Sequence, residues 1–232
     1  MTEPAVALHE VRFAYRGGAN VLDIPTLHVA RGERIFLHGP SGSGKTTLLG
    51  LIAGVLAPTT GRVQVLGQDL GALGSAGRDR FRAAHIGYVF QMFNLIPYLS
   101  VRENITLPVR LSRLRHARLG SGDPDQEAMR LAAGLEIDAL LDAPTAALSV
   151  GQQQRVAVAR ALMGAPELVV CDEPTSALDA DRRDRFLELL FASVQRAGST
   201  LVFVSHDLSL AERFGRTVAL AQLNRSSRTV AA

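Results

Sequence analysis

The sequence predicts an α/β fold with a mostly parallel sheet flanked by helices, an N-terminal antiparallel β lobe and an inserted helical lobe. A glycine-rich segment at residues 39–46 lies between a strand pattern and a helical pattern. Continuous apolar runs at residues 168–171 and 201–204 alternate with helical patterns, which is typical of parallel strands buried on both faces. Between them, a mostly helical stretch at residues 92–144 is punctuated by prolines and predicts the inserted lobe.

The elements follow in order along the chain. Short strands are predicted before the glycine-rich segment, and a helix after it that runs until Pro58. A turn with a short helix at residues 67–80 and a strand at residues 86–90 precede the lobe. After the lobe we expect helices at residues 152–163 and 181–196, each followed by one of the apolar strands. The chain is thus one domain, residues 1–232, described as a core of 1–91 and about 145–222, a helical lobe of about 92–144, and a tail of 223–232 that frays from Arg225.

The bulk composition is that of a single globular unit. The chain has 232 residues, of which 47% are hydrophobic, and its mean hydropathy is +0.14. Its longest apolar runs are far shorter than the ~20 residues that span a bilayer, and its N-terminus lacks the pattern of a secretory signal. We therefore expect a cytoplasmic protein. Cys171, the only cysteine, lies in an apolar run and is expected to be a small buried side chain.

Charge gives a weaker indication. The net charge is +3, but the basic residues are interleaved with 22 acidic ones, which favours a mixed, solvated surface over a nucleic-acid site. Basic density is highest at Arg110, Arg113, Arg115, His116 and Arg118. We expect an exposed helix face there, with contact to lipid head groups or an acidic partner as the alternative.

The glycine-rich segment has the spacing of a phosphate-binding loop. It reads Gly39, Pro40, Ser41, Gly42, Ser43, Gly44, Lys45, Thr46, with Thr47 next, and its flanking strand and helix are the context that this motif requires. Lys45 is the only lysine among 25 lysine and arginine residues. A compact ammonium fits inside a ring of backbone amides, where a flat guanidinium is too wide. The segment therefore predicts a nucleotide-binding P-loop, with Thr46 as a ligand of Mg²⁺.

Two carboxylates follow the apolar strand at residues 168–171. Asp172 is at the edge where an open α/β sheet presents its ligand, and it can hold a metal ion through water. Glu173 is next in the sequence and can accept a proton from an attacking water molecule. Because Pro174 follows, the alternative is an acidic pair at the start of a helix, but the phosphate loop favours the functional interpretation.

Taken together, the motifs resemble the nucleotide-binding subunit of ATP-binding-cassette (ABC) transporters, a P-loop NTPase-type fold, over nearly the whole chain. The motifs that carry the resemblance, in sequence order, are the phosphate loop, Gln91 after residues 87–90, the segment 148–155 (LSVGQQQR), residues 168–173 (LVVCDE), residues 176–179 (SALD) and His206 within residues 205–207 (SHD).

The resemblance implies a role for each matching position. Tyr15 would stack on adenine, and Gln91 would sense the metal ion and the attacking water. Ser149, Gly151 and Gln152 would cap the γ-phosphate of ATP bound to the opposite subunit. Asp179 would bridge the two subunits, and His206 would hold the γ-phosphate. A packing role for Tyr15 and a core position for His206 are the alternatives.

One position departs from the family pattern. Val150 stands where the family usually has glycine, and a β-branched residue cannot adopt a positive φ without strain. We expect Val150 to loosen the ATP-bound dimer.

Because the phosphate loop and the Ser149 cap are separate half-sites, the resemblance implies a two-fold, head-to-tail homodimer that traps ATP with Mg²⁺. The apolar segment after Gln91, residues 92–99, is expected to dock a transmembrane permease subunit, which would keep the chain peripheral on the inner face of the membrane. Its alternative is burial in the helical lobe. The segment resembles branches that drive lipoprotein release, macrolide-type export or related mechanical work.

Three other classes share parts of this pattern. Translation-associated and DNA-repair ATPases of the family carry two cassettes or a long coiled coil, and neither fits a single cassette of 232 residues. A small-molecule kinase would have no need for residues 149–152. A cell-division ATPase that signals through a membrane partner without moving a solute has the same architecture and is the strongest alternative.

Overall fold

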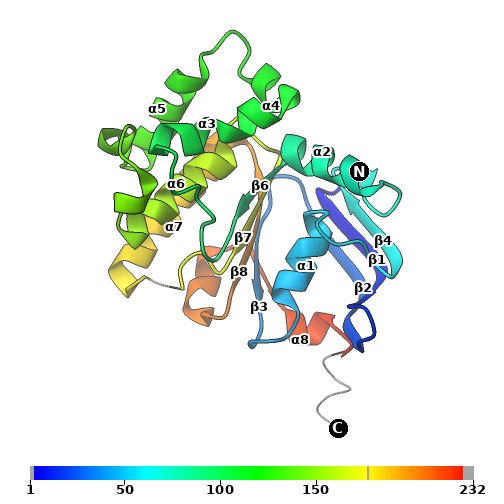
Figure 1. Cartoon of the computed structure of the whole chain (residues 1–232). Coiled ribbons are helices and arrows are strands. Elements are labelled where there is room, and N and C mark those ends of the chain that lie inside the picture. Colours follow the sequence, from blue (N-terminus) through cyan, green and yellow to red (C-terminus); the bar gives the residue numbers. More distant parts are fainter. Residues whose placement is uncertain (1–2, 177, 227–232) are drawn as a thin grey trace. The chain divides into compact units, whose positions relative to one another are not determined.

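The computed structural model describes residues 3–176 and 178–226, and Figure 1 labels its helices and strands. The chain divides into two compact units. The first comprises the residues up to Arg82 and those from Thr200 onward, and the second runs from Ala83 to Ser199. The predicted helical lobe, about residues 92–144, is a smaller segment than the second unit, and its boundaries stay a prediction.

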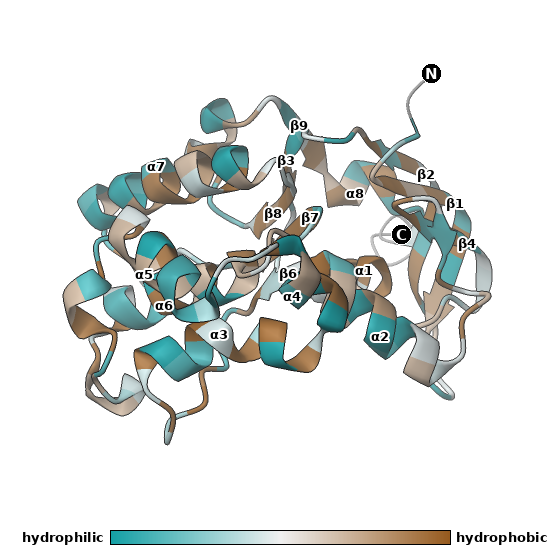
Figure 2. Ribbon diagram, turned by 90° about the horizontal axis from the view of Figure 1, so that it is seen from above, coloured by the Kyte–Doolittle hydropathy of each residue, from teal (hydrophilic) through white to brown (hydrophobic). Residues whose placement is uncertain are grey.

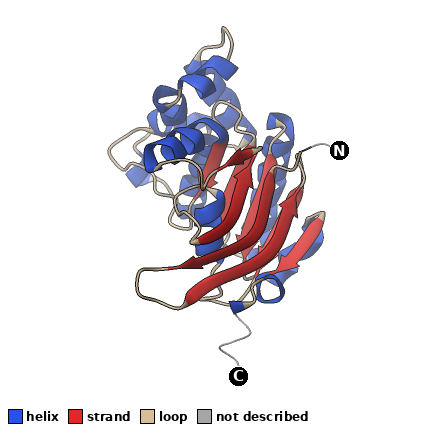
Figure 3. Cartoon of the chain, turned by 90° about the vertical axis from the view of Figure 1, so that its right-hand side faces the viewer, coloured by secondary structure: helices blue, strands red, loops and turns tan. Residues whose placement is uncertain are grey.

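The first unit contains the predicted antiparallel lobe, a sheet with strand order β2-β1-β4-β5, whose strands are red in Figure 3. Val6 of β1 pairs with Val29 of β2 and with Val65 of β4, so three valines meet on the buried face. The strand bounds are β1 Val6–Ala14, β2 Asn20–Val29, β4 Thr60–Val65 and β5 Gln68–Asp69. Alternation of buried and exposed residues along β2 is what a sheet with one solvated face requires.

Parallel strands form the rest of the first unit's sheet structure. β3 (Arg34–His38) lies between β8 (Thr200–Ser205) and β9 (Arg216–Ala219) and pairs with both in parallel. Phe36 of β3 packs on Phe203 and Phe214, with ring centroids 6.1 Å and 5.1 Å away. All six residues of β8 are buried, which confirms the prediction that the apolar run at residues 201–204 is a buried parallel strand.

Helix α1 (Lys45–Ile52) is shorter than the sequence indicates. Leu56 has the helical spacing but lies beyond the end of α1, because Gly54 adopts a left-handed φ of 68° and turns the chain. The backbone N–H of Leu56 then donates to the carbonyl of Gly50. A Cβ atom at Gly50 would lie 3.0 Å from Leu56 Cδ1, so the glycine makes room for this returning side chain. The other helices of the first unit are η3 Leu208–Arg213 and α8 Leu220–Leu223, and α2 Ser75–His85 crosses the boundary.

The segment after α8 is held in place, contrary to the expectation of fraying from Arg225. Asn224 is 1% exposed, and its side-chain amide accepts from Asp23 N at 2.8 Å and donates to Val21 O at 2.9 Å. Arg225 N donates to Asp23 O, also at 2.8 Å. These bonds fasten the segment to β2. The remainder of the predicted tail, residues 227–232, lies outside the described residues.

The second unit combines a parallel strand pair with helices. β6 (Ile86–Val89) and β7 (Leu168–Asp172) pair in parallel, and β7 is buried along its whole length, including Cys171 as expected. A Cβ atom at Gly87 would lie 2.3 Å from the carbonyl oxygen of Ala161, so α6 packs directly on the backbone of β6. The helices are α3 Val101–Leu111, α4 Arg113–Arg118, α5 Pro124–Gly134, η1 Asp138–Leu140, η2 Thr145–Ala147, α6 Val150–Leu162 and α7 Ala180–Ala197.

Helix α3 begins with a capping box, in which Ser100 and Glu103 each bond the other's backbone N–H. Pro108 is one of the prolines that were expected to punctuate residues 92–144, but it lies inside α3 and does not separate two helices. Its missing N–H costs the helix one internal bond. Pro124, in contrast, occupies the first turn of α5, where that N–H is not needed.

The basic segment at residues 110–118 is only partly an exposed face. Arg115 is 2% exposed, and its guanidinium donates to three carbonyls: Ala161 O at 3.2 Å, Met163 O at 2.9 Å and Ile86 O at 2.5 Å. Ala161 and Met163 are at the C-terminal end of α6, where a cation is favoured. Burial, followed by the nearby charge of Arg118, lowers the pKa of Arg115 to about 10.

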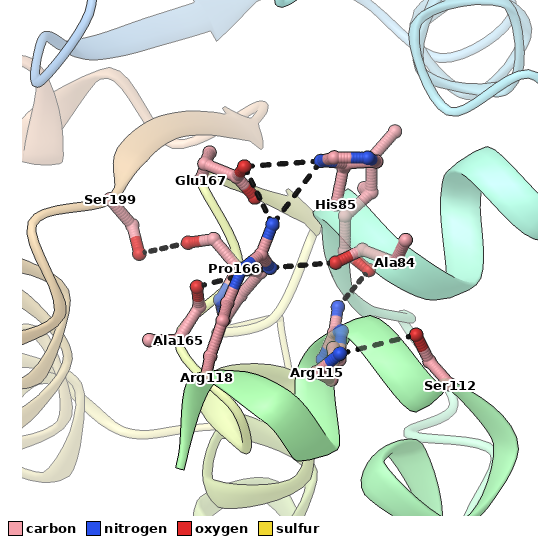
Figure 4. A network of polar contacts seen from close by, with 10 residues as sticks. Ala84, His85, Ser112, Arg115, Arg118, Ala165, Pro166, Glu167 and Ser199 are labelled. Carbon is pink, nitrogen blue, oxygen red and sulfur yellow. Dashed lines mark hydrogen bonds and ion pairs between the residues drawn. The ribbon is translucent and has the colours of Figure 1, made fainter. Parts of the chain in front are cut away.

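Arg118 turns inward beside Arg115 (Figure 4). It donates to Ala84 O at 2.8 Å and to the carboxylate of Glu167 at 2.7 Å, and Glu167 lies 3.1 Å from His85 Nδ1. Burial raises the pKa of Glu167, but the hydrogen bond with His85 and the charge of Arg118 outweigh it and hold this pKa below its ordinary value. Arg115 and Arg118 therefore fasten α4 to the starts of β6 and β7.

Replacing Arg115 by Met should lower the free energy of unfolding by about 3 kcal/mol, because it leaves three buried carbonyls without their donor. Chemical denaturation followed by circular dichroism measures this change. The matched control is Arg113→Met, at an exposed position of the same helix, for which we expect a change within about 0.5 kcal/mol. Equal stability of the two variants would contradict a fastening role for Arg115.

Candidate functional site

The phosphate loop connects β3 to α1 in the first unit. Gly42 and Gly44 adopt left-handed φ angles of 77° and 95°, which side chains rarely allow. A Cβ atom at Gly44 would lie 2.8 Å from Leu22 Cδ2, and one at Gly39 would lie 2.7 Å from Ser43 Oγ. The loop therefore needs glycine both for its turns and for its close approach to neighbouring side chains.

Lys45 spans this loop. Its ammonium donates to the carbonyl oxygens of Gly39 at 2.8 Å and Pro40 at 3.0 Å, which are at the opposite end of the loop. Ser43 Oγ is buried and has no hydrogen-bond partner among the described residues. The buried hydroxyl of Ser43 is available to donate to a ligand, and the ammonium of Lys45 lies across the loop. Both features fit a site that binds phosphate oxygens.

Tyr15 lies beside the same loop, just after β1. Its hydroxyl is 3.3 Å from Thr47 Oγ1, and its ring packs edge-on against Phe13 with centroids 4.9 Å apart. More than half of its surface, 54%, is exposed. The ring is thus fixed in position and still offers surface for a planar group.

His206 follows β8 at the edge of the sheet where the phosphate loop begins. His38, the last residue of β3, pairs with Ser205, the last residue of β8. Gly39 and His206 therefore directly follow the ends of two neighbouring parallel strands, at the same edge of the sheet. His206 is exposed. The alternative of a core histidine is therefore wrong.

The two carboxylates lie at the end of β7 in the second unit. Asp172 is 6% exposed and Glu173 is 8% exposed. Burial and the charge of Asp172 together raise the pKa values of Tyr88 and Cys171. Glu173 adopts a left-handed φ of 49°, an uncommon conformation for a residue other than glycine, and one that tends to occur at functional sites. The two residues are not the start of a helix, since α7 begins at Ala180.

Gln91 follows β6 at the same edge of this strand pair. Val89 pairs with Cys171, so Gln91 and Asp172 leave parallel neighbours at the same end. Phe93 and Asn94 then adopt left-handed φ angles of 58° and 48°. Their carbonyls accept hydrogen bonds from Arg160 of α6 at 2.6 Å and 2.7 Å, which holds the backbone of this segment against that helix.

Ser149 begins α6. It forms a capping box with Gln152, in which the side chain of each bonds the backbone N–H of the other, at 3.4 Å and 2.9 Å. A Cβ atom at Gly151 would have no neighbour within 4 Å, so the first turn of α6 is open. A pocket of about 290 Å³ adjoins this turn; its lining residues are Glu136, Ser149, Gly151, Gln152, Gln154, Arg155, Leu178, Arg182 and Phe186. The exposed start of a 13-residue helix is suited to an anion.

The expected strain at Val150 is absent. Val150 is the first residue of α6, and its φ is not among the positive values of the described residues. The positive-φ argument is therefore wrong, because a residue in a right-handed helix can be β-branched. The side chain of Val150 is 49% exposed, so what it adds at this position is apolar surface.

Asp179 has a local role that the sequence did not indicate. Its carboxylate accepts from the backbone N–H of Arg182 at 3.0 Å and so caps α7. The side chain of Arg182 also lies 3.3 Å from it. The neighbouring position 177 of the predicted motif at residues 176–179 lies outside the described residues.

The predicted site residues fall into two sets, one in each unit. Residues 39–47, Tyr15 and His206 belong to the first unit, whereas Gln91, Ser149, Gly151, Gln152, Asp172, Glu173 and Asp179 belong to the second. Thr46 in the first set, and Gln91 and Asp172 in the second, carry oxygen donors of the kind that Mg²⁺ prefers. The described residues contain no cluster of three or more His, Cys, Asp or Glu side chains able to hold a metal. Nor do they include a helix that is both long and apolar enough to cross a bilayer.

Sequence reasoning missed two buried amides that support these sets. Gln154 of α6 donates from its side chain to the carbonyl of Pro174, directly after Glu173, and so joins the capped helix to the loop of the carboxylates. Asn224 lies 3.5 Å from the carbonyl of Ser43 in the phosphate loop. Gln154 falls within the family segment 148–155, but amides are usually exposed, and no pattern in the sequence indicates that Gln154 or Asn224 is buried.

Comparison with known proteins gives consistent matches. The family described as "ABC transporter" matches residues 22–176. The uncharacterized ABC transporter ATP-binding protein YbbA of Escherichia coli is 41% identical over 221 residues, which cover 94% of this chain and 95% of that protein. The lipoprotein-releasing system ATP-binding protein LolD of Anaeromyxobacter dehalogenans is 43% identical over 222 residues, covering 94% and 90%.

A solved structure is similar over the same extent. It is the dimeric, post-hydrolysis state of the ATP-binding cassette MJ0796 bound to ADP and Pi. The TM-score is 0.81 at 33% identity, and the match covers 92% of this chain and 93% of that one.

Proposed function

This chain belongs to the ABC transporter family and is an ATP-hydrolysing subunit of it, and from this premise we propose that it drives a separate membrane permease in export or in other mechanical work on a substrate. Its 43% identity to a subunit of a lipoprotein-releasing system favours this direction. The ATP-binding cassette MJ0796, to which this chain is similar, is dimeric, and we propose that this chain likewise dimerises and pairs with a permease. The proposal places it on the cytoplasmic face of the membrane.

The observation that carries the proposal is that the chain has two separate anion-binding features. One is the glycine loop with Lys45, and the other is the capped, open start of α6 at Ser149. A head-to-tail homodimer would use both, with the loop of one subunit and the helix start of the other on the same nucleotide. Binding of ATP then closes the dimer, and hydrolysis opens it.

The roles that we propose divide between the two sets of residues. In the first unit, the loop residues Gly39, Pro40, Ser41, Gly42, Ser43, Gly44, Lys45, Thr46 and Thr47 bind the phosphates. Tyr15 takes the adenine ring and His206 holds the γ-phosphate. Thr46 also offers its hydroxyl to Mg²⁺, which, when bound, neutralises negative charge that develops on the phosphates.

In the second unit, Glu173 accepts the proton of the attacking water on its carboxylate, with Gln91 orienting that water. Asp172, through water, and Gln91 would hold Mg²⁺. Ser149, Gly151 and Gln152 cap the phosphate of the partner's nucleotide. Asp179 links the two copies through its position at the start of α7. Its bonds to Arg182 show that the same carboxylate also stabilises its own helix.

We propose that the permease docks on residues 92–99. Met92 and Tyr98 are 81% and 83% exposed, among the most exposed large apolar side chains of the described residues, whereas Phe93 between them is 7% exposed. Phe93 therefore anchors the segment, and Met92 and Tyr98 are available for a partner. Because this segment follows Gln91 directly, the state of the nucleotide can be communicated to the docking surface.

Replacing Met92 and Tyr98 together by Ser should weaken association with the permease by about 100-fold or more, since each large apolar side chain that becomes buried contributes ~1.5–3 kcal/mol. Basal ATP hydrolysis by the subunit alone should stay unchanged. Pull-down of the tagged subunit with its solubilised permease, and permease-stimulated phosphate release, measure the two effects.

The control is Met129→Ser on α5, a methionine that is 53% exposed in the same unit. It should keep full association. If the double variant binds the permease as well as the control does, the docking surface lies elsewhere. If the permease that is recovered moves no solute and only relays a signal, the cell-division type of function replaces the transport proposal.

A further inference from the structure

A second surface of the second unit lies where α3 meets α4. A pocket of about 450 Å³ opens there, and its lining residues are Val109, Arg110, Leu111, Arg113, His116 and Ala117. We call it the α3–α4 pocket. Half of these residues are basic, and of the residues that the structure describes, none that lines the pocket is acidic. Its volume is within the ~300–1,000 Å³ of sites for small ligands.

In the part of the chain that the structure describes, the side chains of Arg110, Arg113 and His116 form no hydrogen bond or ion pair. The pKa of Glu103 on α3 is lowered by its hydrogen bonds with Ser100 and, to a smaller extent, by the charge of Arg110, so Glu103 is the acidic group that acts on Arg110. Arg115 and Arg118, from the same stretch of sequence, bond to carbonyls and to Glu167. This stretch therefore contains two kinds of arginine, one that fastens α4 and one that lines the pocket without a hydrogen bond to the described residues.

Exposed leucines border the cations. Leu111, the last residue of α3, lines the pocket and is 71% exposed, and Leu114, the second residue of α4, is 44% exposed. Figure 2 shows hydrophobic and hydrophilic residues adjoining on α3 and α4. Cations next to protruding aliphatic side chains are the arrangement found where proteins lie on the surface of an anionic membrane.

We propose that the α3–α4 pocket binds the phosphate of an anionic phospholipid headgroup. Arg110 and Arg113 donate to the phosphate oxygens, His116 contributes a ring nitrogen, and Leu111 and Leu114 enter the boundary between headgroups and acyl chains. The inference rests on the proposed function in one respect, namely that the permease brings this subunit to a membrane surface.

A lipid accounts for these features better than an acidic protein segment or a soluble phosphate. A soluble phosphate has no use for Leu111 and Leu114, which stay exposed around it. An acidic peptide would have to match a compact pocket formed by two short helices, whereas a phosphate on a glycerol stem needs only one group of cations and an apolar border.

The test is sedimentation of the full-length subunit, without permease, with vesicles of phosphatidylcholine alone or mixed with phosphatidylglycerol. We expect binding to the mixed vesicles only, decreasing as salt is added. Each arginine near an anionic surface contributes roughly fivefold in partitioning, so Arg110→Gln combined with Arg113→Gln should reduce it by roughly 30-fold. The control pair is Arg31→Gln with Arg80→Gln, which removes the same charge from exposed positions outside the pocket.

Further measurements separate the possible ligands. Leu111→Gln should reduce vesicle binding and leave the binding of soluble glycerol phosphate unchanged. Equal partitioning of the two arginine pairs, or no binding to the mixed vesicles, would overturn the proposal. Binding of glycerol phosphate or of polyglutamate without binding of vesicles would overturn it as well, in favour of a soluble anion or an acidic protein segment.

The same samples also test the proposed function independently. Arg110, Arg113 and Leu111 are outside the nucleotide machinery, so their variants should hydrolyse ATP at the rate of the unmodified subunit. Normal hydrolysis without vesicle binding rejects the lipid site alone. Vesicle binding without any ATP-dependent dimer rejects the proposed mechanism and leaves the lipid site standing.

Discussion

Changing Glu173 to Gln is expected to lower the rate of ATP hydrolysis by roughly 10²- to 10⁴-fold, the usual contribution of a general base. The amide has the shape of the carboxylate but cannot take the proton of the attacking water. Glu173 is 8% exposed and lies directly after β7, so the substitution should leave the surrounding backbone and ATP binding intact. Because hydrolysis opens the dimer in the proposed mechanism, the variant should accumulate as an ATP-bound dimer.

Phosphate release measures the first effect, and size-exclusion chromatography with light scattering measures the second. The matched control is Glu212→Gln, an exposed glutamate that follows β8, which should hydrolyse ATP normally. Normal hydrolysis by the Glu173 variant would reject the assignment of the base. A hydrolysis-deficient variant that binds ATP but remains monomeric would reject the dimer mechanism.

Changing Lys45 to Arg is expected to lower kcat/KM for ATP by roughly 10²- to 10³-fold, although the charge is conserved. The ammonium of Lys45 fits between the carbonyls of Gly39 and Pro40, both within 3.0 Å, inside a loop whose glycines leave little room. A guanidinium is planar, and its donors diverge, so it cannot occupy this position and still reach the phosphates as a point charge. Weaker ATP binding should accompany the loss of turnover.

Binding of a fluorescent ATP analogue and steady-state hydrolysis measure these effects. Arg80→Lys, the reverse exchange at an exposed position of α2, is the control and should change neither. Full activity of the Lys45 variant would mean that the only lysine of the chain has no special role at this position.

The phosphate loop could be predicted from the sequence because a single short segment determines its geometry. Gly42 and Gly44 supply the left-handed turns, and the apolar strand before them and the helix after them are visible as patterns. Asp172 and Glu173 could be predicted for a similar reason, since an apolar strand that ends in two carboxylates has few other interpretations. The resemblance to a known family then supplied the proposed roles of Tyr15 and His206, which no local pattern specifies.

Other features depend on partners that are distant in the sequence. Arg115 and Arg110 look alike in the sequence, but Arg115 lies over the uncapped carbonyls at the end of α6 and Arg110 does not. The end of α1 depends on Gly54, and the end of the chain on the amide of Asn224, which bonds β2 about 200 positions earlier. Val150 was misjudged because the family's glycine was assumed to need a positive φ.

The hydrogen bonds from Arg160 to Phe93 and Asn94 have a mechanical consequence. Ser149, the proposed cap for the partner's nucleotide, is the N-cap residue of α6, and Arg160 lies eleven residues after it, about 16 Å away at 1.5 Å per residue. The helix contains no proline or internal glycine after Gly151, so it moves as a stiff rod. A displacement imposed at the nucleotide end is therefore carried along α6 to the backbone of Phe93 and Asn94, next to the exposed side chain of Met92.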